Sequence, residues 1–473
     1  GWVQKSRNKG GIIFVDLRDR SGIMQIIFEN GPISEEGFEK AAKLRSEFVI
    51  AVEGEVMARS GAVNENLATG ELEVKAESLR ILSEAEPPPF PIEENSKTKE
   101  DLRLKYRYLD LRNPNMKKNI VMRSQIVAEL RQRMYALNFM EITTPILTCS
   151  SPEGARDYLV PARNHPGKFY ALPQAPQQFK QILMASGFDR YFQIAPCFRD
   201  EDARADRSPG EFYQLDMEMA FASQEDVFSI VEQVLPPVFE KYGIYKEASK
   251  APFVRIPYLE AMDKYGSDKP DLRIDLVLTD ATEVMQGCGF AAFEGQTVKA
   301  IVVDGFTATR KQIDAICAEV EVQTARKGFW FRVDENGEFV GGISKFLQDR
   351  KEEVIKALGL KNGDFVGLAA GKKLEAQKTA GVYRKLLGAA SEKHMKKDCY
   401  EFCWIVDFPM YEIGEESGEL EFCHNPFSMP QGGMDALNNQ DPLEILAYQY
   451  DLVCNGVELS SGAVRIHDPE IMI

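Results

Sequence analysis

Charged and aromatic residues at 198–202 and 211–216 are the clearest candidates for chemistry in this chain. The two runs read Phe-Arg-Asp-Glu-Asp and Glu-Phe-Tyr-Gln-Leu-Asp. Alternating apolar and polar residues predict two half-buried strands, with Tyr213 toward the core and Arg199 and Phe212 on a polar face. An arginine beside an aromatic ring suits a nucleotide and the charged end of a second substrate. A solvated hairpin with surface ion pairs is the alternative interpretation.

A second group of polar residues follows Pro176, which is typical of the first turn of a helix. Gln177 and Lys180 are three residues apart and therefore share one helical face, opposite Ile182. This arrangement aims an amide and an ammonium at something anionic, whereas an exposed polar face is the ordinary alternative. The preceding loop, residues 150–158, has Pro and Gly joints and could close over a pocket.

Two carboxylates near the end of the chain indicate a metal site. We expect Asp451 on a helix that starts around Pro442, and Glu458 in the strand that follows. Such a pair can hold Mg²⁺, which takes carboxylates together with substrate phosphates. Strict alternation places Glu458 and Arg465 on opposite faces, so a shared site requires a bulge within residues 460–462.

The eight cysteines and the isolated His424 are weaker candidates. No CxxC pair is present, which suits reduced thiols in a cytoplasmic protein. Cys399, Cys403, Cys423 and His424 could be considered a zinc set. However, residues 400–405 look like a strand and the spacing matches no familiar zinc knuckle.

Composition limits the class of protein. The chain has 473 residues, enough for two or three domains, and a net charge of −16. That charge argues against indiscriminate nucleic-acid binding, which depends on neutralising phosphates. A local basic surface remains compatible with it, and residues 103–112 are basic and aromatic, as a phosphate guide or a plain helix start would be. No run approaches 18 apolar residues, so we expect no membrane association.

The order of patterns predicts an α+β fold of several domains. Five short β patterns and one helix, about 35–47, predict a small closed barrel of the OB type over residues 1–84. A proline run then opens a linker or hinge at 85–117. A long amphipathic helix and an edge strand at 140–147 follow, and together they form a plausible dimer surface.

The second half of the chain is expected to contain an inserted domain and the end of the main domain. Residues 276–399 mix strands and helices without a cluster of chemically committed side chains, which predicts an inserted α/β domain. A buried strand at 402–409 then resumes the earlier fold. The main domain is therefore expected in two parts, 118–275 and 400–473.

Taken together, these segments resemble the class II aminoacyl-tRNA synthetases, and among them the bacterial-type aspartyl-tRNA synthetases. The resemblance runs over the whole chain. It depends on the motifs at 154–158 (Gly-Ala-Arg-Asp-Tyr), 177–180, 198–202, 265–273 (Tyr-Gly-Ser-Asp-Lys-Pro-Asp-Leu-Arg) and 465–467 (Arg-Ile-His). It implies an OB-type anticodon-binding domain, a class II catalytic domain with an antiparallel sheet, and the inserted domain.

The resemblance implies formation of aspartyl-adenylate from L-aspartate and ATP, then transfer to the 3′ end of tRNA(Asp), with tRNA(Asn) as a second candidate acceptor. It implies a homodimer and Mg²⁺ as cofactor. It assigns aspartate binding to Glu153, Gln177, Lys180, Arg199, Asp216, His424 and Arg465. ATP binding is assigned to Arg199, Asp200, Glu201, Ser208, Phe212, Gln214 and Glu458, and metal binding to Asp451 and Glu458. The resemblance also implies that Arg199 is the catalytic residue.

In the barrel, the resemblance assigns anticodon contacts to Arg7, Phe14, Gln25 and Glu73. The residue types fit, because an aromatic ring can stack on a base and polar side chains can read base edges.

The chain also departs from the family pattern. The third class II motif is absent, so we expect a sequence truncated at both ends whose isolated activity is weak or absent. Ala175 stands where a serine is common, and Asn425 follows His424 where a second histidine is frequent. Lys9 occupies a position linked in the family to the choice between tRNA(Asp) and tRNA(Asn).

Two alternatives remain. An asparaginyl- or lysyl-type synthetase is disfavoured by the pairing of Lys180 with Arg465 and by the large insertion. A non-catalytic tRNA-binding fragment is favoured by the missing third motif. The presence of Arg199, Asp451 and Glu458 together opposes it.

Overall fold

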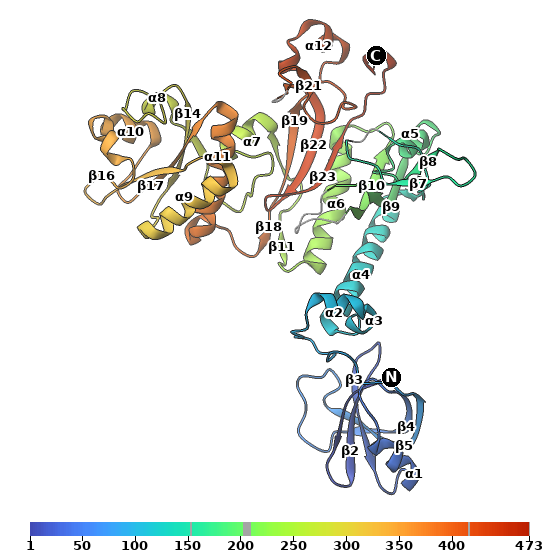
Figure 1. Ribbon diagram of the computed structural model, residues 1–473. Coiled ribbons are helices and arrows are strands. Elements are labelled where there is room, and N and C mark those ends of the chain that lie inside the picture. Colours follow the sequence, from blue (N-terminus) through green and yellow to red (C-terminus); the bar gives the residue numbers. More distant parts are fainter. Residues whose placement is uncertain (152–153, 202–209, 415–416, 473) are drawn as a thin grey trace. The chain divides into compact units, whose positions relative to one another are not determined.

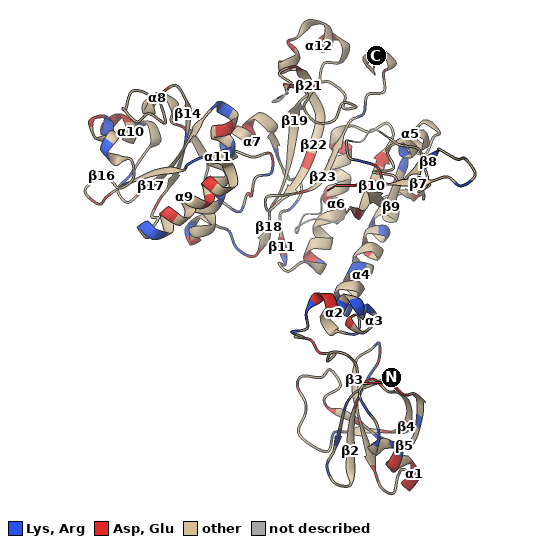
Figure 2. Ribbon diagram, viewed as in Figure 1, with Lys and Arg blue, Asp and Glu red and all other residues tan. Residues whose placement is uncertain are grey.

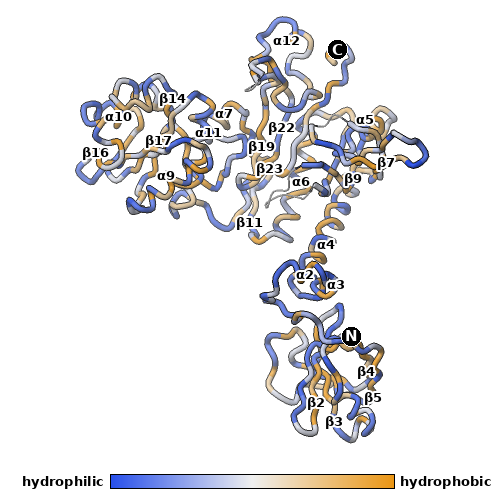
Figure 3. Tube along the Cα trace, in the orientation of Figure 1, coloured by the Kyte–Doolittle hydropathy of each residue, from blue (hydrophilic) through white to orange (hydrophobic). Residues whose placement is uncertain are grey.

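The computed structural model describes residues 1–151, 154–201, 210–414 and 417–472, and the chain forms two compact units, residues 1–125 and 126–473 (Figure 1). Basic and acidic segments are interspersed in both units (Figure 2). Many of the strands coincide with hydrophobic segments of the chain (Figure 3). Among the described residues, no helix combines the length and apolar character needed to cross a membrane.

The first unit contains a closed five-stranded barrel with the strand order β1-β2-β3-β5-β4. Its strands are β1 (Trp2–Asn8), β2 (Ile12–Arg18), β3 (Ile23–Glu29), β4 (Val49–Ala58) and β5 (Leu72–Ser83). Alternation along β2 directs Ile13 and Val15 into the buried core, as expected for an OB-type barrel. The sequence-based prediction of this fold is confirmed.

Helix α1 (Glu35–Ala42) is shorter than the predicted helix over about 35–47, and the residues after it leave the helical conformation. Ser34 caps its first turn by accepting a hydrogen bond from the N–H of Gly37. Beyond the helix, Glu47 takes a positive φ of 68° and forms a buried ion pair of 2.8 Å with Arg18. A continued helix could not place that carboxylate against the barrel.

The basic and aromatic segment at 103–112 forms two short helices, α2 (Glu100–Lys105) and α3 (Arg107–Asp110). Arg103 and Arg107 both form ion pairs with the buried Asp110, at 2.7 and 2.5 Å. The Arg103 pair joins α2 to α3 and the Arg107 pair lies within α3, so two of its arginines have structural partners, which favours the plain-helix interpretation. Helix α4 (Pro114–Ala136) follows.

The second unit contains two sheets that share helix α6 (Gln224–Tyr242) between them (Figure 1). One sheet has the order β10-β9-β6, and the other β12-β19-β22-β23. Their strands are β6 (Met140–Glu141), β9 (Arg190–Phe198), β10 (Glu211–Met219), β12 (Val254–Pro257), β19 (Phe402–Pro409), β22 (Leu446–Cys454) and β23 (Val457–Ala463). The pairings are antiparallel except β6 with β9 and β12 with β19.

Helix α6 links the two sheets through opposite faces. Phe228 stacks on Trp404 of β19, with ring centroids 4.0 Å apart. Ile230 and Val234 pack instead in the cluster that contains Phe192 of β9. Shorter elements complete the unit: β7 (Leu159–Pro161), β8 (Phe169–Ala171), α5 (Gln177–Ala185), β11 (Glu247–Ala248), α7 (Tyr258–Tyr265), β18 (Cys399–Tyr400), β20 (Tyr411–Ile413), β21 (Leu420–Phe422), α12 (Gly433–Asn439) and α13 (Pro469–Met472).

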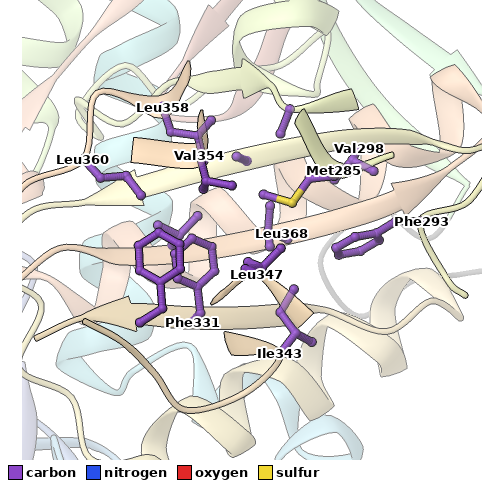
Figure 4. Packing of buried hydrophobic residues seen from close by; sticks show 14 of the residues in the cluster. Met285, Phe293, Val298, Phe331, Ile343, Leu347, Val354, Leu358, Leu360 and Leu368 are labelled. Atoms are coloured by element: carbon purple, nitrogen blue, oxygen red, sulfur yellow. The ribbon is translucent and has the colours of Figure 1, made fainter. Parts of the chain in front are cut away.

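Between α7 and β18 the chain forms an antiparallel sheet with the order β13-β14-β17-β15-β16. Its strands are β13 (Leu278–Asp280), β14 (Thr297–Val303), β15 (Phe329–Val333), β16 (Phe339–Val340) and β17 (Phe365–Gly371), and its helices are α8 (Thr282–Met285), α9 (Arg310–Thr324), α10 (Lys351–Leu358) and α11 (Lys373–Ala390). The cluster in Figure 4 includes residues of α8 and α10, whereas α9 and α11 contribute to a separate cluster. Helices thus cover both faces of the sheet.

The prediction of a helix around Asp451 is wrong. A short 3₁₀ turn at Pro442–Glu444 leads into strand β22, which carries Asp451. Its residues from Gln449 to Cys454 are all buried, and a short buried strand has no period that distinguishes it from a buried helix. Strand β22 pairs with β19 on one side and β23 on the other, which satisfies its backbone hydrogen-bonding groups.

The expected bulge is present but lies earlier in β23. Leu452 pairs with Ser460 and Val453 with Glu458, so the extra residue is Leu459. The strand ends at Ala463, before Arg465. The departure from strict alternation therefore lies between Glu458 and Arg465.

Candidate active site

Lys180 on α5 is buried, and two carboxylates of β10 surround its ammonium. Its Nζ lies 2.8 Å from Asp216 Oδ1 and 3.3 Å from Glu218 Oε2. Burial lowers the pKa of Lys180, but the two carboxylates outweigh it and raise that pKa above its usual value. The opposite face of the helix is the exposed one, since Ile182 is 61% exposed. The interpretation of Lys180 as part of an exposed polar face is therefore wrong.

Arg465 brings a second cation to the same place from the far end of the chain. Its Nη2 donates a hydrogen bond of 3.4 Å to Gln177 Oε1 on the first turn of α5. The Arg465 charge is close enough to act on the pKa of Lys180, which it lowers. The structure thus brings together the three residues Gln177, Lys180 and Arg465 that the sequence predicted as one group.

Several polar atoms of the predicted site residues are left unsatisfied. They are buried and have no hydrogen-bond partner among the described residues: Gln177 Nε2, Asp216 Oδ2, Arg199 Nε, Arg465 Nε and Nη1, and Asp451 Oδ1. Unsatisfied buried groups are costly, so native proteins retain them mainly where a ligand or water completes them. The mixture of donors and carboxylate acceptors suits a ligand with both a negative and a positive group.

Arg199 and Phe212 meet at the end of the β9–β10 hairpin where the connecting loop leaves the strands. The Arg199 guanidinium lies over the Phe212 ring, 5.1 Å from its centroid. The Arg199 N–H donates to the carbonyl of Gly210 at 2.8 Å, and the N–H of Asp200 to that of Arg156 at 2.9 Å. The Arg199 cation and the Phe212 ring therefore lie on the same face of the hairpin, as predicted.

Other predictions for the hairpin have mixed outcomes. Tyr213 is 51% exposed on β10, so the prediction that it lies in the core is wrong. Gln214 is half-buried on β10, and Glu201 is exposed. Glu153 and Ser208 lie outside the described residues.

Asp451 and Glu458 lie near each other on adjacent strands, with Lys269 beside them. The Lys269 Nζ is 3.1 Å from Glu458 Oε2. Burial, and then the charge of Glu458, raises the pKa of Asp451 to about 7. The described residues include no group of three or more His, Cys, Asp or Glu side chains suited to a metal. A cation here would need ligands from a substrate to complete its shell.

His424 lies next to this region, after β21. Its ring packs edge-on against Phe408 and Tyr258, with centroid distances of 5.0 and 6.2 Å. Partial burial lowers the pKa of His424. Cys399 and Cys403 are buried on β18 and β19, and all eight cysteines are free thiols.

Comparison with known proteins identifies the family. Residues 99–473 match the model of the class II tRNA synthetases (D, K and N), and residues 1–82 match the OB-fold nucleic acid binding domain. The chain is a class II tRNA synthetase. Its family consists of aminoacyl-tRNA ligases, and the resemblance stated from sequence is confirmed at this level.

Individual class II tRNA synthetases give the same result. The chain is 52% identical to an aspartate–tRNA ligase of Streptomyces coelicolor and 53% identical to an aspartate–tRNA(Asp/Asn) ligase of Zymomonas mobilis subsp. mobilis. Each match covers 100% of this chain and 80% of the relative. An aspartyl-tRNA synthetase structure from Entamoeba histolytica shares the fold, with a TM-score of 0.56 and 20% identity over 100% of this chain and 75% of that one.

In the OB domain of this class II tRNA synthetase, the four predicted anticodon residues are neighbours. Arg7 forms an ion pair of 2.7 Å with Asp16 and pairs across the sheet with Phe14. The buried Gln25 donates to Glu73 Oε2 at 2.9 Å. Sequence reasoning missed Arg59, which donates to Gln25 Oε1 at 2.8 Å and carries a buried Nη1 without a partner among the described residues.

Three further residues of the catalytic domain were missed. Glu218 is the second carboxylate that pairs with Lys180. Its position two residues after Asp216 on a strand puts both side chains on one face, and this spacing could have predicted the contact. Gln174 anchors the loop before α5 by donating to the carbonyl of Ala155 at 2.9 Å. Lys269 belongs to a motif quoted from the sequence without a role.

The raised pKa of Asp451 predicts a pH-dependent stability difference. In the unfolded chain this carboxyl ionises near 3.8, against about 7 in the folded one. The folded state therefore favours the protonated form, and this contribution to stability is lost as pH rises through about 7. Asp451→Asn cannot ionise, so its melting temperature should exceed that of the wild type by more at pH 8 than at pH 5.

Differential scanning fluorimetry at both pH values, without divalent cations, measures this difference. Glu444→Gln is a control in an exposed turn. An Asn variant whose advantage over the wild type is equal at pH 5 and pH 8 would contradict the prediction.

Proposed function

We propose that this chain carries out the ATP-dependent activation of L-aspartate to aspartyl-adenylate and the transfer of the aspartyl group to the 3′ end of tRNA(Asp). The observation that carries the proposal is the pair of cations, Lys180 and Arg465, set together with unpartnered polar atoms around them. The names of the relatives agree with it.

The cation pair suits a side-chain carboxylate. Lys180 and Arg465 would bind the aspartate carboxylate from two sides, while Asp216 Oδ2 and Gln177 would order the amino group. Asparagine offers an amide that would leave donor groups unpaired, and each lost charge-assisted bond costs about 1.5–3 kcal/mol. This difference favours an aspartate enzyme over an asparagine or lysine one.

Arg199 would supply the positive charge that the reaction needs. An oxygen of the aspartate α-carboxylate attacks the α-phosphorus of ATP, and the bond from that phosphorus to the pyrophosphate oxygen breaks. Arg199 would bridge the two reacting groups, and Phe212 would stack on the adenine. Gln214, Asp200, Glu201 and Ser208 are the further ATP-binding candidates. Neither this step nor transfer to a tRNA hydroxyl needs an enzyme nucleophile, since positioning and charge neutralisation suffice.

Asp451 and Glu458 fit a Mg²⁺ ion that is shared with ATP. Asp451 Oδ1 has no hydrogen-bond partner among the described residues, and the side chain of Glu458 is 38% exposed. The two carboxylates would hold one side of the ion, and substrate phosphates would complete its shell. When bound, Mg²⁺ neutralises charge on the departing pyrophosphate.

Two assays on the complete gene product test the proposal. We expect ATP–pyrophosphate exchange that requires aspartate and is not supported by asparagine or lysine. We also expect charging of tRNA(Asp). Parallel charging of tRNA(Asn) decides between a strict and a dual acceptor range, both of which occur among the relatives. tRNA binding without exchange would instead support a non-catalytic module.

Phe14 provides a test of the anticodon role. Alternation places it on the outer face of the barrel, half-buried and beside Arg7. Stacking of one base on an aromatic ring contributes about 1–3 kcal/mol, so Phe14→Ala should weaken tRNA binding roughly 5- to 150-fold. Aspartate-dependent exchange should not change. Filter binding measures the affinity, and Val56→Ala, at a residue that is 60% exposed on β4, is the control. Unchanged tRNA affinity in the Phe14 variant would argue against a stacking contact.

We also propose a homodimer in the cytoplasm. Apolar side chains remain exposed along and after β6, among them Met140 (53%), Ile146 (44%) and Leu147 (53%). Exposed apolar side chains that gather on one surface are typical of interaction sites, and the assembly assay tests whether these do. Sedimentation equilibrium tests the assembly, and a monomer at micromolar concentration would contradict it. The free cysteines agree with a reducing compartment.

A further inference from the structure

The motif at 265–273 has a physical role that the proposed reaction leaves open. Lys269 from this motif extends to the carboxylate pair, with its Nζ 3.1 Å from Glu458 Oε2 and 3.4 Å from Asp268 Oδ2. Its ammonium is thus a positive charge at the place where the proposed metal would lie.

The backbone that carries Lys269 is fixed. The Lys269 N–H donates to Ser267 Oγ at 3.0 Å, and Asp271 forms an ion pair of 2.7 Å with Arg273. The turn between β22 and β23 packs against the same segment: a β-carbon on Gly456 would lie 3.4 Å from Asp271 Cβ. The lysine is therefore anchored next to the strands that carry both carboxylates.

The ammonium of Lys269, in contrast, can separate from the Glu458 carboxylate. The side chains of Lys269 and Glu458 are 36% and 38% exposed. Ion pairs with this much exposure contribute little to stability and exchange readily with solvent. Lys180 is different, because its side chain is 9% exposed and two carboxylates hold it. Of these two lysines, only Lys269 can give up its carboxylate at low cost.

We propose that Lys269 is a tethered cation that holds Glu458 in the metal-free enzyme and is displaced from it when a divalent cation binds between Asp451 and Glu458. An ammonium and a metal ion compete for the same carboxylate oxygens, so Lys269 lowers metal affinity until the nucleotide arrives. Lys269 is a positioning residue that acts through Glu458. The inference rests on the proposed metal-binding role of this carboxylate pair.

Binding of Mn²⁺ to the complete gene product, followed by electron paramagnetic resonance of the free ion, tests this inference without measuring activity. Without nucleotide, Lys269→Met should bind Mn²⁺ about three- to tenfold more tightly than the wild type, because the competing ion pair is gone. Lys264→Met is the matched control, since it removes an equal charge from the 53% exposed Lys264 on α7, which pairs with Glu260.

The outcomes separate the inference from the function on which it rests. Unchanged or weaker Mn²⁺ binding by Lys269→Met, or an equal gain in Lys264→Met, would overturn the role of Lys269 alone. A wild type that binds no Mn²⁺ even with ATP would overturn the metal role of Asp451 and Glu458 as well. Thermal melting of each variant confirms that the measured protein is folded.

Discussion

Arg199→Leu is expected to lower the rate of aspartate-dependent ATP–pyrophosphate exchange by about 10³-fold or more. Arg199 is placed to neutralise charge that grows on the α-phosphate while the aspartate carboxylate attacks it. A fixed cation in a partly buried site stabilises this charge far more than water does. Because the interaction is strongest in the transition state, kcat should fall more than KM rises.

The same variant should fold normally. The Arg199 guanidinium contacts the Phe212 ring, and its Nε has no partner among the described residues, so within that part of the chain leucine removes a cation–π contact and no ion pair. Arg163→Leu, in the exposed turn between β7 and β8, is the matched control for loss of one arginine. A loss of less than tenfold in Arg199→Leu, or an equal loss in the control, would contradict the assigned role.

The parts of the site that sequence could predict are those governed by local pattern. The β9–β10 hairpin follows from alternation, and the placement of Gln177 and Lys180 on one helical face follows from helical spacing. The closed barrel follows from five short strands separated by turns and one helix. Each of these depends on residues within a short stretch of chain.

The parts that sequence could not give depend on distant partners. Lys180 is buried because its carboxylates lie on another element, 36 residues later in the case of Asp216. Asp451 was placed on a helix because six consecutive buried residues of β22 lack an alternating pattern. Lys269 had no predicted role, because its contact with Glu458 depends on how β22 and β23 pack against a remote loop.

Arg465→Leu and Lys180→Met provide the second large test, because they should affect activity alike and stability differently. Each removes one of two cations from the aspartate carboxylate, so kcat/KM for aspartate should fall about 10²- to 10³-fold in both. Arg465 forms one long hydrogen bond to Gln177, and its loss should leave the melting temperature nearly unchanged. Lys180→Met leaves Asp216 and Glu218 without their counter-charge.

Removing one partner of a buried ion pair costs about 3–5 kcal/mol, so the Lys180 variant should melt roughly 5 °C lower. Scanning calorimetry of both variants measures this contrast, and exchange assays with aspartate and asparagine measure specificity. The ratio of the two kcat/KM values should shrink in both variants, because fewer donors remain unpaired when the amide binds. Retained discrimination in both would mean that the two cations do not face the substrate side chain. In that case the buried Lys180 would serve the fold alone.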